Sequence, residues 1–277
     1  MTLDALQSFT WQTITAGGPN GDIKIIAGDD TGLDGLDLPE FRTTLTGRQG
    51  AGSHPGAQYA GDMQPACRVL VTDTPTLMVL RASMRPRPNP FDEQPWTFRG
   101  FGFPTDTTDW RLYVRPELCE FRANLLATAG GAWMVDLAWN ATDPTIYSDT
   151  LHVYDSTVAG IPASGFAVNC TNTGSAPSPL HTGRALRVLI TAATTCTSPK
   201  ILNYDTGEYV VWPGLQIGAG QTFAWETDRT SWIGTQRVDG HRTPGTAQPI
   251  LYPGDNNIHV DTATGTFDVR IEWRDTH

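Results

Sequence analysis

The residues with the most obvious chemical potential are carboxylates that gather in one glycine-rich stretch near the N-terminus. They are Asp29, Asp30, Asp34, Asp37 and Glu40. A calcium loop of the EF-hand type needs a bidentate glutamate at its twelfth position. Counted from Asp30, that position is Phe41, and Glu40 comes one place too early. The spacing therefore favours solvated loop carboxylates, and we expect no metal and no other cofactor.

Catalytic patterns do not stand out in the rest of the chain. The six histidines are not spaced as metal ligands, and the motifs GxxxxGK(S/T), GxSxG and HExxH do not occur. A glycosidase needs two carboxylates that face a cleft, one of them with a raised pKa. Glu226 beside Trp225 comes nearest to such an acid, but a carboxylate at a strand edge is the favoured interpretation. We predict that the chain is not an enzyme.

Nine tryptophans are many for a chain of 277 residues. If exposed, they would form a platform on which sugar rings stack, and the candidates are Trp212, Trp225, Trp232 and Trp273. Tryptophan is also enriched in buried positions and at the centres of protein interfaces. We favour the core and interface interpretation and keep carbohydrate binding as the alternative.

The composition indicates a folded, β-rich and acidic protein. Hydrophobic residues make up 39% of the chain, and 28 glycines with 20 prolines predict many turns between short elements. The formal net charge of −10 disfavours nucleic-acid binding. The start, MTLDALQSFT, lacks the basic and apolar regions of a signal peptide, and no apolar run is long enough to span a membrane. We expect synthesis in the cytoplasm and no membrane contact.

The four cysteines, Cys67, Cys119, Cys170 and Cys196, are far apart in the sequence and form no CxxC pair. This disfavours a zinc site, because zinc ligands usually come in close pairs. We expect free thiols. A disulfide between Cys170 and Cys196 is the alternative, because two neighbouring strands could bring them together.

The N-terminal half predicts short strands. β-Branched and aromatic residues dominate 7–14, 22–27, 67–73, 76–83, 96–103, 110–116 and 132–140. A short DTP turn joins 67–73 to 76–83, which predicts a hairpin. One helix is expected over 117–127, because its apolar residues have the spacing i, i+3, i+7, i+8. These residues are Leu118, Phe121, Leu125 and Leu126.

Two segments of this half do not have a strand pattern. Residues 28–62 are rich in glycine and poor in apolar residues, which predicts a loop longer than compact domains usually contain. Residues 85–96 contain four prolines. Proline removes backbone donors from a β-ladder, so this segment is expected to be an extended arm. Long loops often make functional contacts.

The rest of the chain predicts a second β domain. Turn signals without periodic apolar residues between 143 and 165 place a domain boundary near 150, which gives domains 1–150 and 151–277. About eight short strands follow, with turn signals every 8–12 residues, as in β-sandwiches. Gly207 is expected at a positive φ angle in a hairpin tip. In the closing run, Val269, Ile271 and Trp273 are expected to face inward and Arg270, Glu272 and Arg274 outward.

The order of motifs in this second domain resembles one known family. The chain reads SPKILN (198–203), DTGE (205–208), GLQIGAG (214–220), TFAWET (222–227), LYPGDNNI (251–258) and VRIEWR (269–274). In this order and spacing, the motifs are similar to the C-terminal domain of the distal tail proteins of bacteriophages with long, non-contractile tails. The stretch 36–62, the RPRPNPF arm and DPTIYS (143–148) resemble the N-terminal part of such minor tail proteins, so the likeness covers nearly the whole chain.

The resemblance implies both a fold and a function. The fold would be mainly β, with an N-terminal β-barrel-like belt domain that contains one short helix, and a C-terminal galectin-like β-sandwich. Six copies would form a ring that joins the tail tube to the tail tip or baseplate and leaves a channel for DNA. The partners would be further copies of the chain, the tail tube protein, and the tail tip hub or other minor tail proteins. The protein would sit at the distal end of the tail in the virion.

The resemblance supplies no catalytic residues, so the expected site is an interface. We expect residues 28–62 and 85–104 to contact neighbouring subunits or the tube, with arginines that meet acidic partners. The interface residues expected are Arg42, Arg48, Arg85, Arg87, Phe91 and Trp96. The alternative function is a carbohydrate-binding module that contributes to recognition of the host cell wall.

Overall fold

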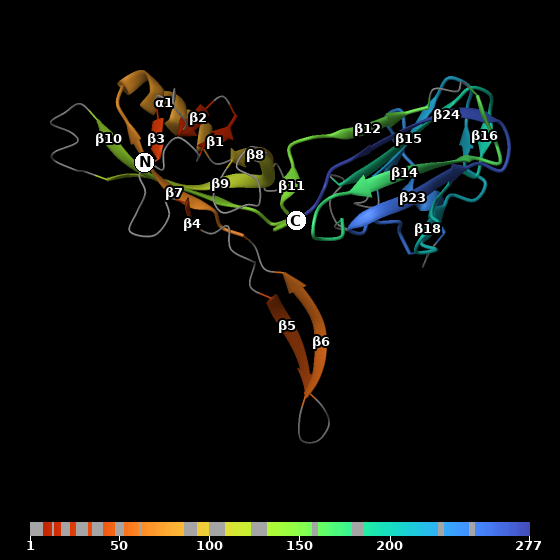
Figure 1. Cartoon of the computed structure of the whole chain (residues 1–277), viewed down its shortest axis with the longest axis horizontal. Helices are drawn as coiled ribbons and strands as arrows, with labels where there is room; N and C mark the ends of the chain where they lie inside the picture. The colour runs from red at the N-terminus through yellow and green to blue at the C-terminus, as the bar shows by residue number, and fades with distance from the viewer. Residues whose placement is uncertain are drawn as a thin grey trace. The chain divides into compact units, whose positions relative to one another are not determined.

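The structure is a computed structural model of the chain, and it describes residues 8–12, 14–17, 23–25, 33–34, 41–47, 53–60, 63–85, 93–99, 109–122, 132–156, 160–178, 185–226, 230–243 and 247–277. The chain divides into two compact units, Met1–Ile146 and Tyr147–His277. Figure 1 shows the first unit in red to green and the second in green to blue. The boundary expected from the sequence lies near residue 150.

The first unit is built around a closed β-barrel of seven strands. Their order is β10–β7–β3–β2–β1–β8–β9, and β9 pairs again with β10, which closes the barrel. Closure gives each of these strands a paired neighbour on both sides. The strands are β1 (Ser8–Trp11), β2 (Ile14–Gly17), β3 (Ile23–Ile25), β7 (Ala66–Val71), β8 (Gln94–Arg99), β9 (Trp110–Arg122) and β10 (Trp133–Asn140), and β4 (Leu33–Asp34) pairs with β7.

Alternate side chains of these strands fill the barrel. Phe9 and Trp11 of β1 are buried, whereas the residues on either side of Phe9 are partly exposed. The rings of Trp96 and Trp139 are 5.4 Å apart, and the ring of Phe9 lies 5.6 Å from Trp96 and 5.5 Å from Trp139. Buried and partly exposed residues thus alternate along the strand, because successive side chains of a strand point to opposite faces. The same alternation in the sequence predicted the strands.

One segment predicted as a strand is a helix. Residues 76–83 belong to α1 (Thr74–Ser83), so the hairpin expected with 67–73 is wrong. The carboxylate of Asp73 accepts a hydrogen bond from the backbone N–H of Thr76 at 2.8 Å, and a proline occupies the first turn. Both features are typical of helix starts, where the first backbone N–H groups have no partner within the helix. The aspartate accepts a hydrogen bond from one of these groups, and the proline has no N–H that would need a partner. Leu77 and Leu80 then pack into the barrel core.

The helix predicted over 117–127 is also wrong for the residues that the structure describes. Residues 117–122 continue the long strand β9, and 123–127 lie outside the described part of the chain. The strand pairs with both β8 and β10. Leu118 is exposed, and Cys119 packs against the core. The pairing with β8 covers residues 110–114, and residues 118–122 pair with β10. This pairing with β10 outweighs the helical spacing of the apolar residues, because local propensity is a weak constraint.

The stretch 28–62 contains more regular structure than a loop. Besides β4, it includes the strands β5 (Phe41–Gly47) and β6 (Ser53–Ala60). These two strands pair only with each other among the described strands, from Phe41 opposite Ala60 to Gly47 opposite Ser53. Figure 1 shows them as a long hairpin in orange. The prediction of a continuous loop is therefore wrong for these residues.

The second unit is a β-sandwich with two main sheets. One has the order β12–β24–β15–β20–β21–β22 with β13 beside β24, and the other has the order β14–β23–β17–β18. The strands are β11 (Tyr147–Ser148), β12 (His152–Asp155), β13 (Ile161–Pro162), β14 (Phe166–Asn172), β15 (Leu186–Ala192), β16 (Cys196–Thr197), β17 (Lys200–Asn203), β18 (Tyr209–Val211), β19 (Gln216–Ile217), β20 (Thr222–Glu226), β21 (Ser231–Ile233), β22 (Gln236–Arg237), β23 (Gly254–Asp261) and β24 (Thr266–Trp273). A 3-10 helix, η2 (Asp239–His241), follows β22.

Side chains from both sheets meet in one core. Val188 and Phe223 come from one sheet, and Ile201 and Ile258 come from the other. The two faces of each sheet therefore differ, and the outer faces are left for polar side chains and contacts. The predicted fold class, mainly β with a barrel and a sandwich, is confirmed.

The closing strand β24 follows its predicted alternation until its last residue. Val269, Ile271 and Trp273 are buried, and Arg270 is exposed. Arg274 was expected to face outward but is buried, and its Nη1 donates a hydrogen bond of 3.0 Å to the backbone oxygen of Ser148. The alternation fails there because the strand ends at Trp273. The positive φ of 75° predicted for Gly207 is confirmed.

All four cysteines are free thiols, so the disulfide alternative is not realised. Cys67, Cys170 and Cys196 are buried, and Cys119 is half-buried. Burial raises the pKa of the Cys170 thiol to about 12. Such a thiol stays protonated at neutral pH and acts as a small apolar core residue.

Candidate interaction surfaces

Two of the four arginines predicted for an interface, Arg42 and Arg85, belong to the described part of the chain. Arg85 is exposed and comes one residue after the C-cap of α1. Arg42 is part of β5, where the structure describes the backbone only. Arg48, Arg87 and Phe91 fall outside the described residues. Arg85 is thus the one member of this set whose side chain can be placed at a surface.

Trp96, the remaining member of the set, is part of the barrel core. It lies in β8 and is fully buried against Phe9, Phe98 and Trp139. The residue follows the proline arm directly, which suggested contact with a partner. Its position in the strand turns the ring inward, so that no face of it remains for another subunit.

Helix α1 has a second apolar face that points away from the barrel. Met78 is 58% exposed and Val79 is 49% exposed, and Pro75 and Ala82 are exposed as well. These four residues have the spacing i, i+3, i+4, i+7, which places them on one face of a helix. We call them the α1 stripe. A strand pattern over 76–83 does not predict this face, although Asp73 and Pro75 signal a helix start.

The tryptophans considered for sugar stacking are mostly core residues. Trp212 and Trp225 are fully buried in the sandwich. The indole Nε1 of Trp212 donates a hydrogen bond of 3.1 Å to the hydroxyl of Ser231. Trp273 is 9% exposed and stacks on His152, with ring centroids 5.3 Å apart. None of these three rings presents an open face to a sugar.

Trp232 is the candidate that keeps part of its surface exposed. It lies in β21 near the edge of the larger sheet, and the guanidinium of Arg237 is 5.8 Å from its ring centroid. Arg237 in turn forms an ion pair with Asp239. A cation over an indole ring is favourable by itself. Part of the face of this ring is thus already covered by a side chain of the same chain.

Glu226, which came nearest to a catalytic acid, lies on the outer face of the larger sheet. Its Oε1 is 3.1 Å from Nε of Arg187, and Nη1 of Arg187 is 3.6 Å from Glu272. Arg270 joins the same row through Glu272 at 2.6 Å. The ion pairs of Arg187 join neighbouring strands, and the pair of Arg270 and Glu272 lies within β24. Such pairs are typical of a solvated sheet face, which agrees with the interpretation of Glu226 as a strand-edge carboxylate.

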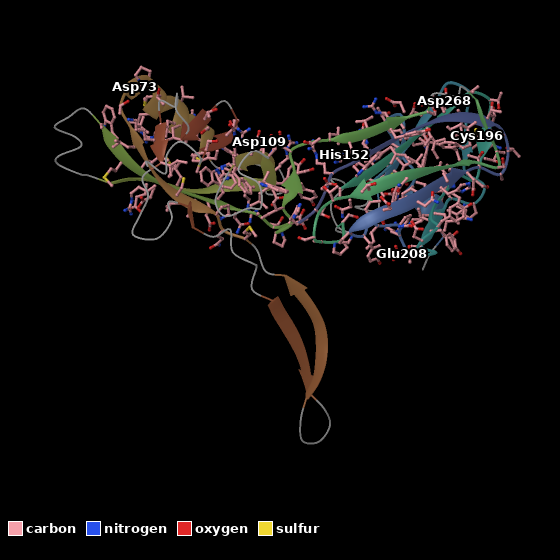
Figure 2. All side chains as sticks on the ribbon, in the orientation of Figure 1. Asp73, Asp109, His152, Cys196, Glu208 and Asp268 are labelled. Carbon is pink, nitrogen blue, oxygen red and sulfur yellow. The ribbon has the colours of Figure 1, made fainter. Side chains whose placement is uncertain are left out.

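Three exposed tyrosines lie on segments that meet at the tip of the β17–β18 hairpin, and none of them was among the predicted site residues. Tyr204, Tyr209 and Tyr252 are 52%, 41% and 38% exposed. Tyr204 and Tyr209 flank the hairpin tip between β17 and β18, and Tyr252 precedes β23. Its hydroxyl donates a hydrogen bond of 3.0 Å to Glu208, which Figure 2 labels. We call these three residues the tyrosine cluster.

Metal ligands and membrane-spanning helices were also considered for the part of the chain that the structure describes. There, no three or more His, Cys, Asp or Glu residues come together in a way that could hold a metal ion. No helix among the described residues is long and apolar enough to cross a membrane.

The architecture of both units matches that of a solved phage protein. The crystal structure of the SPP1 Dit protein (gp 19.1) superposes with a TM-score of 0.56 and 14% sequence identity, and the match covers 88% of this chain and 91% of that one. The chain has a Dit fold. The barrel with its helix and the sandwich are therefore parts of one known architecture. No family model matches the chain, and no curated protein sequence matches it significantly.

Two further solved structures resemble this Dit-like chain more distantly. Both are of the phage p2 baseplate in its activated conformation, one with Sr and one with Ca. Each has a TM-score of 0.48 and 7% identity, over 95% of this chain and 97% of the other.

Proposed function

We propose that this chain is a structural virion protein that forms a homohexameric ring at the distal end of a phage tail. The ring joins the tail tube to the tail tip or baseplate and leaves a channel through which DNA passes. The observation that supports this proposal is the match to SPP1 Dit across both units, covering 88% of the chain. That protein is described as a paradigm of the hub of the adsorption apparatus in phages that infect Gram-positive bacteria.

The α1 stripe supports the ring in particular. Met78 and Val79 are large apolar side chains that the folded monomer leaves in water. A contiguous apolar surface of this kind often marks an interface between proteins. In a cyclic ring, one surface patch of each copy binds a different patch of the next copy. When the ring closes, every copy has both patches buried. We place the α1 stripe and the exposed Arg85 in that subunit interface.

The β5–β6 hairpin is the second element that we assign to contacts with a neighbouring subunit or the tube. Its strands pair with no other described strand of the chain. An isolated two-stranded hairpin is only marginally stable in water. Contact with another subunit or with the tube would stabilise it, and Arg42 in β5 would lie in that contact.

The ring can be tested by measuring the mass of the purified full-length chain. Native mass spectrometry and light scattering should find hexamers in the wild type. Met78→Glu should shift the population to smaller species, because a charge at the centre of an apolar contact must lose its hydration. The matched control is Val153→Glu, which replaces an exposed aliphatic residue of β12 in the sandwich and should leave the hexamers intact.

Two outcomes count against the proposal. If the wild type remains a monomer at high concentration and also fails to assemble when purified tail tube is added, the ring is wrong. If Met78→Glu assembles as well as Val153→Glu does, the α1 stripe is not the interface. Circular dichroism of both variants should match the wild type, because both positions are exposed in the monomer.

A further inference from the structure

The tyrosine cluster consists of three aromatic rings that the folded chain leaves partly exposed to solvent. Tyr204 is 52% exposed, Tyr209 is 41% exposed and Tyr252 is 38% exposed. The three rings come from two segments that adjoin the smaller sheet of the sandwich. Exposed aromatic side chains contribute little to stability, but they offer large contact areas with little loss of entropy on binding.

Each ring of the cluster is held by a neighbouring side chain. Tyr252 donates to Oε1 of Glu208 at 3.0 Å. Burial and this hydrogen bond raise the pKa of Tyr252, so the phenol remains a donor. The ring of Tyr204 packs 4.9 Å from that of His259, and Nζ of Lys200 is 5.4 Å from the ring centroid of Tyr209. The rings are thus positioned before any ligand arrives, which lowers the entropic cost of binding.

Two buried asparagines fix the segments that carry the rings. Asn203 donates to the backbone oxygen of Ile250 at 2.9 Å and accepts from the backbone N–H of Asp205 at 3.0 Å. Asn256 donates to the backbone oxygen of Tyr252 at 2.8 Å and accepts from its N–H at 2.8 Å. The hairpin tip and the loop before β23 are therefore tied to each other through the interior of the sandwich.

Polar acceptors surround the rings. Glu208 precedes Tyr209 in the sequence and accepts the hydrogen bond from Tyr252. Its Oε2 also accepts a hydrogen bond of 3.1 Å from the hydroxyl of Thr206. Asp205 is exposed beside Tyr204 and accepts from the backbone N–H of Asn257 at 2.6 Å. Fixed carboxylates next to exposed rings suit a ligand that has both an apolar C–H face and hydroxyl donors.

We propose that the tyrosine cluster is a binding site for an uncharged oligosaccharide. Sugar rings would stack their C–H faces on Tyr204 and Tyr209, and sugar hydroxyls would donate to Asp205 and Glu208. The carboxylates of Asp205 and Glu208 lie beside the rings and Lys200 lies beside Tyr209, so a polyanion would gain less here than an uncharged ligand. The site lies in the sandwich and goes beyond the proposed ring function, because it does not depend on the α1 stripe.

The experiment uses the full-length chain and named probes. Chitohexaose and maltohexaose are the neutral oligosaccharides, heparin is the polyanion and nona-arginine is the basic peptide, each titrated by calorimetry. At least one neutral probe should bind, and neither charged probe should compete with it. Tyr204→Ala should weaken binding by about tenfold, because a stacked ring contributes a large share of the contact energy. Tyr204→Phe should retain binding, because it keeps the ring.

Control variants separate this site from the other surfaces of the chain. Trp232→Ala removes the partly exposed indole of the larger sheet and should bind as the wild type does. Met78→Glu should also bind normally, which makes the test independent of ring formation. The proposal is wrong if neither neutral probe binds, if Tyr204→Ala binds as tightly as the wild type, or if only heparin or nona-arginine binds.

Discussion

The carboxylate of Asp73 and the backbone N–H of Thr76 form a hydrogen bond of 2.8 Å at the start of the only helix longer than one turn among the described residues. This bond satisfies one of the amides that have no partner inside a helix. We expect Asp73→Ala to lower the free energy of unfolding by about 1 kcal/mol. Urea denaturation monitored by circular dichroism measures the change.

The control for this cap is Asp73→Asn. Asparagine caps helices about as well as aspartate, so it should keep most of the stability. If both variants lose the same free energy, the loss comes from the charge and not from the hydrogen bond. In that case, the cap does not stabilise α1 in the way that the geometry indicates.

The same helix shows which parts of the fold were predictable from the sequence. Asp73 and Pro75 together signal a helix start, so α1 could have been recognised. The strand at 117–122 could not, because its helical spacing is overruled by pairing with β10, which lies elsewhere in the sequence. The alternation of apolar and polar residues predicted most barrel and sandwich strands, because it occurs where one face of a strand is buried and the other is exposed.

The surfaces were less predictable than the strands. Phe223 and Trp225 are two residues apart in β20 and lie on the same buried face. The sequence pattern could therefore have predicted that Trp225 is buried. The tyrosine cluster had no comparable signal. Tyr252 meets Glu208 because buried asparagines join two segments that are distant in the sequence. Such tertiary hydrogen bonds leave no periodic pattern.

Asn256 should contribute strongly to the stability of the sandwich. Its side chain is buried and bonds to backbone groups of Cys170, Tyr252 and Gly254. Asn256→Ala removes these buried hydrogen bonds, and we expect a loss of about 1–3 kcal/mol. Asn257→Ala, at the exposed neighbouring position, should change the free energy of unfolding by less than about 0.5 kcal/mol. Equal losses in the two variants would contradict this role for Asn256.

The buried thiol of Cys170 predicts a loss of stability at alkaline pH. Its pKa is about 12 in the folded protein because of burial, and an unfolded cysteine ionises near 8.5. Between these values the unfolded chain binds fewer protons, so stability falls as pH rises, by at most about 1.4 kcal/mol per pH unit from this group. Cys170→Ala should show a shallower decline between about pH 9 and pH 11. Parallel slopes for both proteins would contradict the prediction.

Trp212 and Trp225 offer a matched pair for measuring one buried hydrogen bond. Both indoles are fully buried in the same core. Trp212 donates to Ser231 at 3.1 Å, whereas Nε1 of Trp225 has no hydrogen-bond partner among the described residues. Replacement by phenylalanine removes similar volume from each site. Trp212→Phe also loses a hydrogen bond, while Trp225→Phe removes an unsatisfied donor. We expect Trp212→Phe to cost at least about 1 kcal/mol more in urea denaturation. A larger loss for Trp225→Phe would mean that packing and not hydrogen bonding separates the two sites.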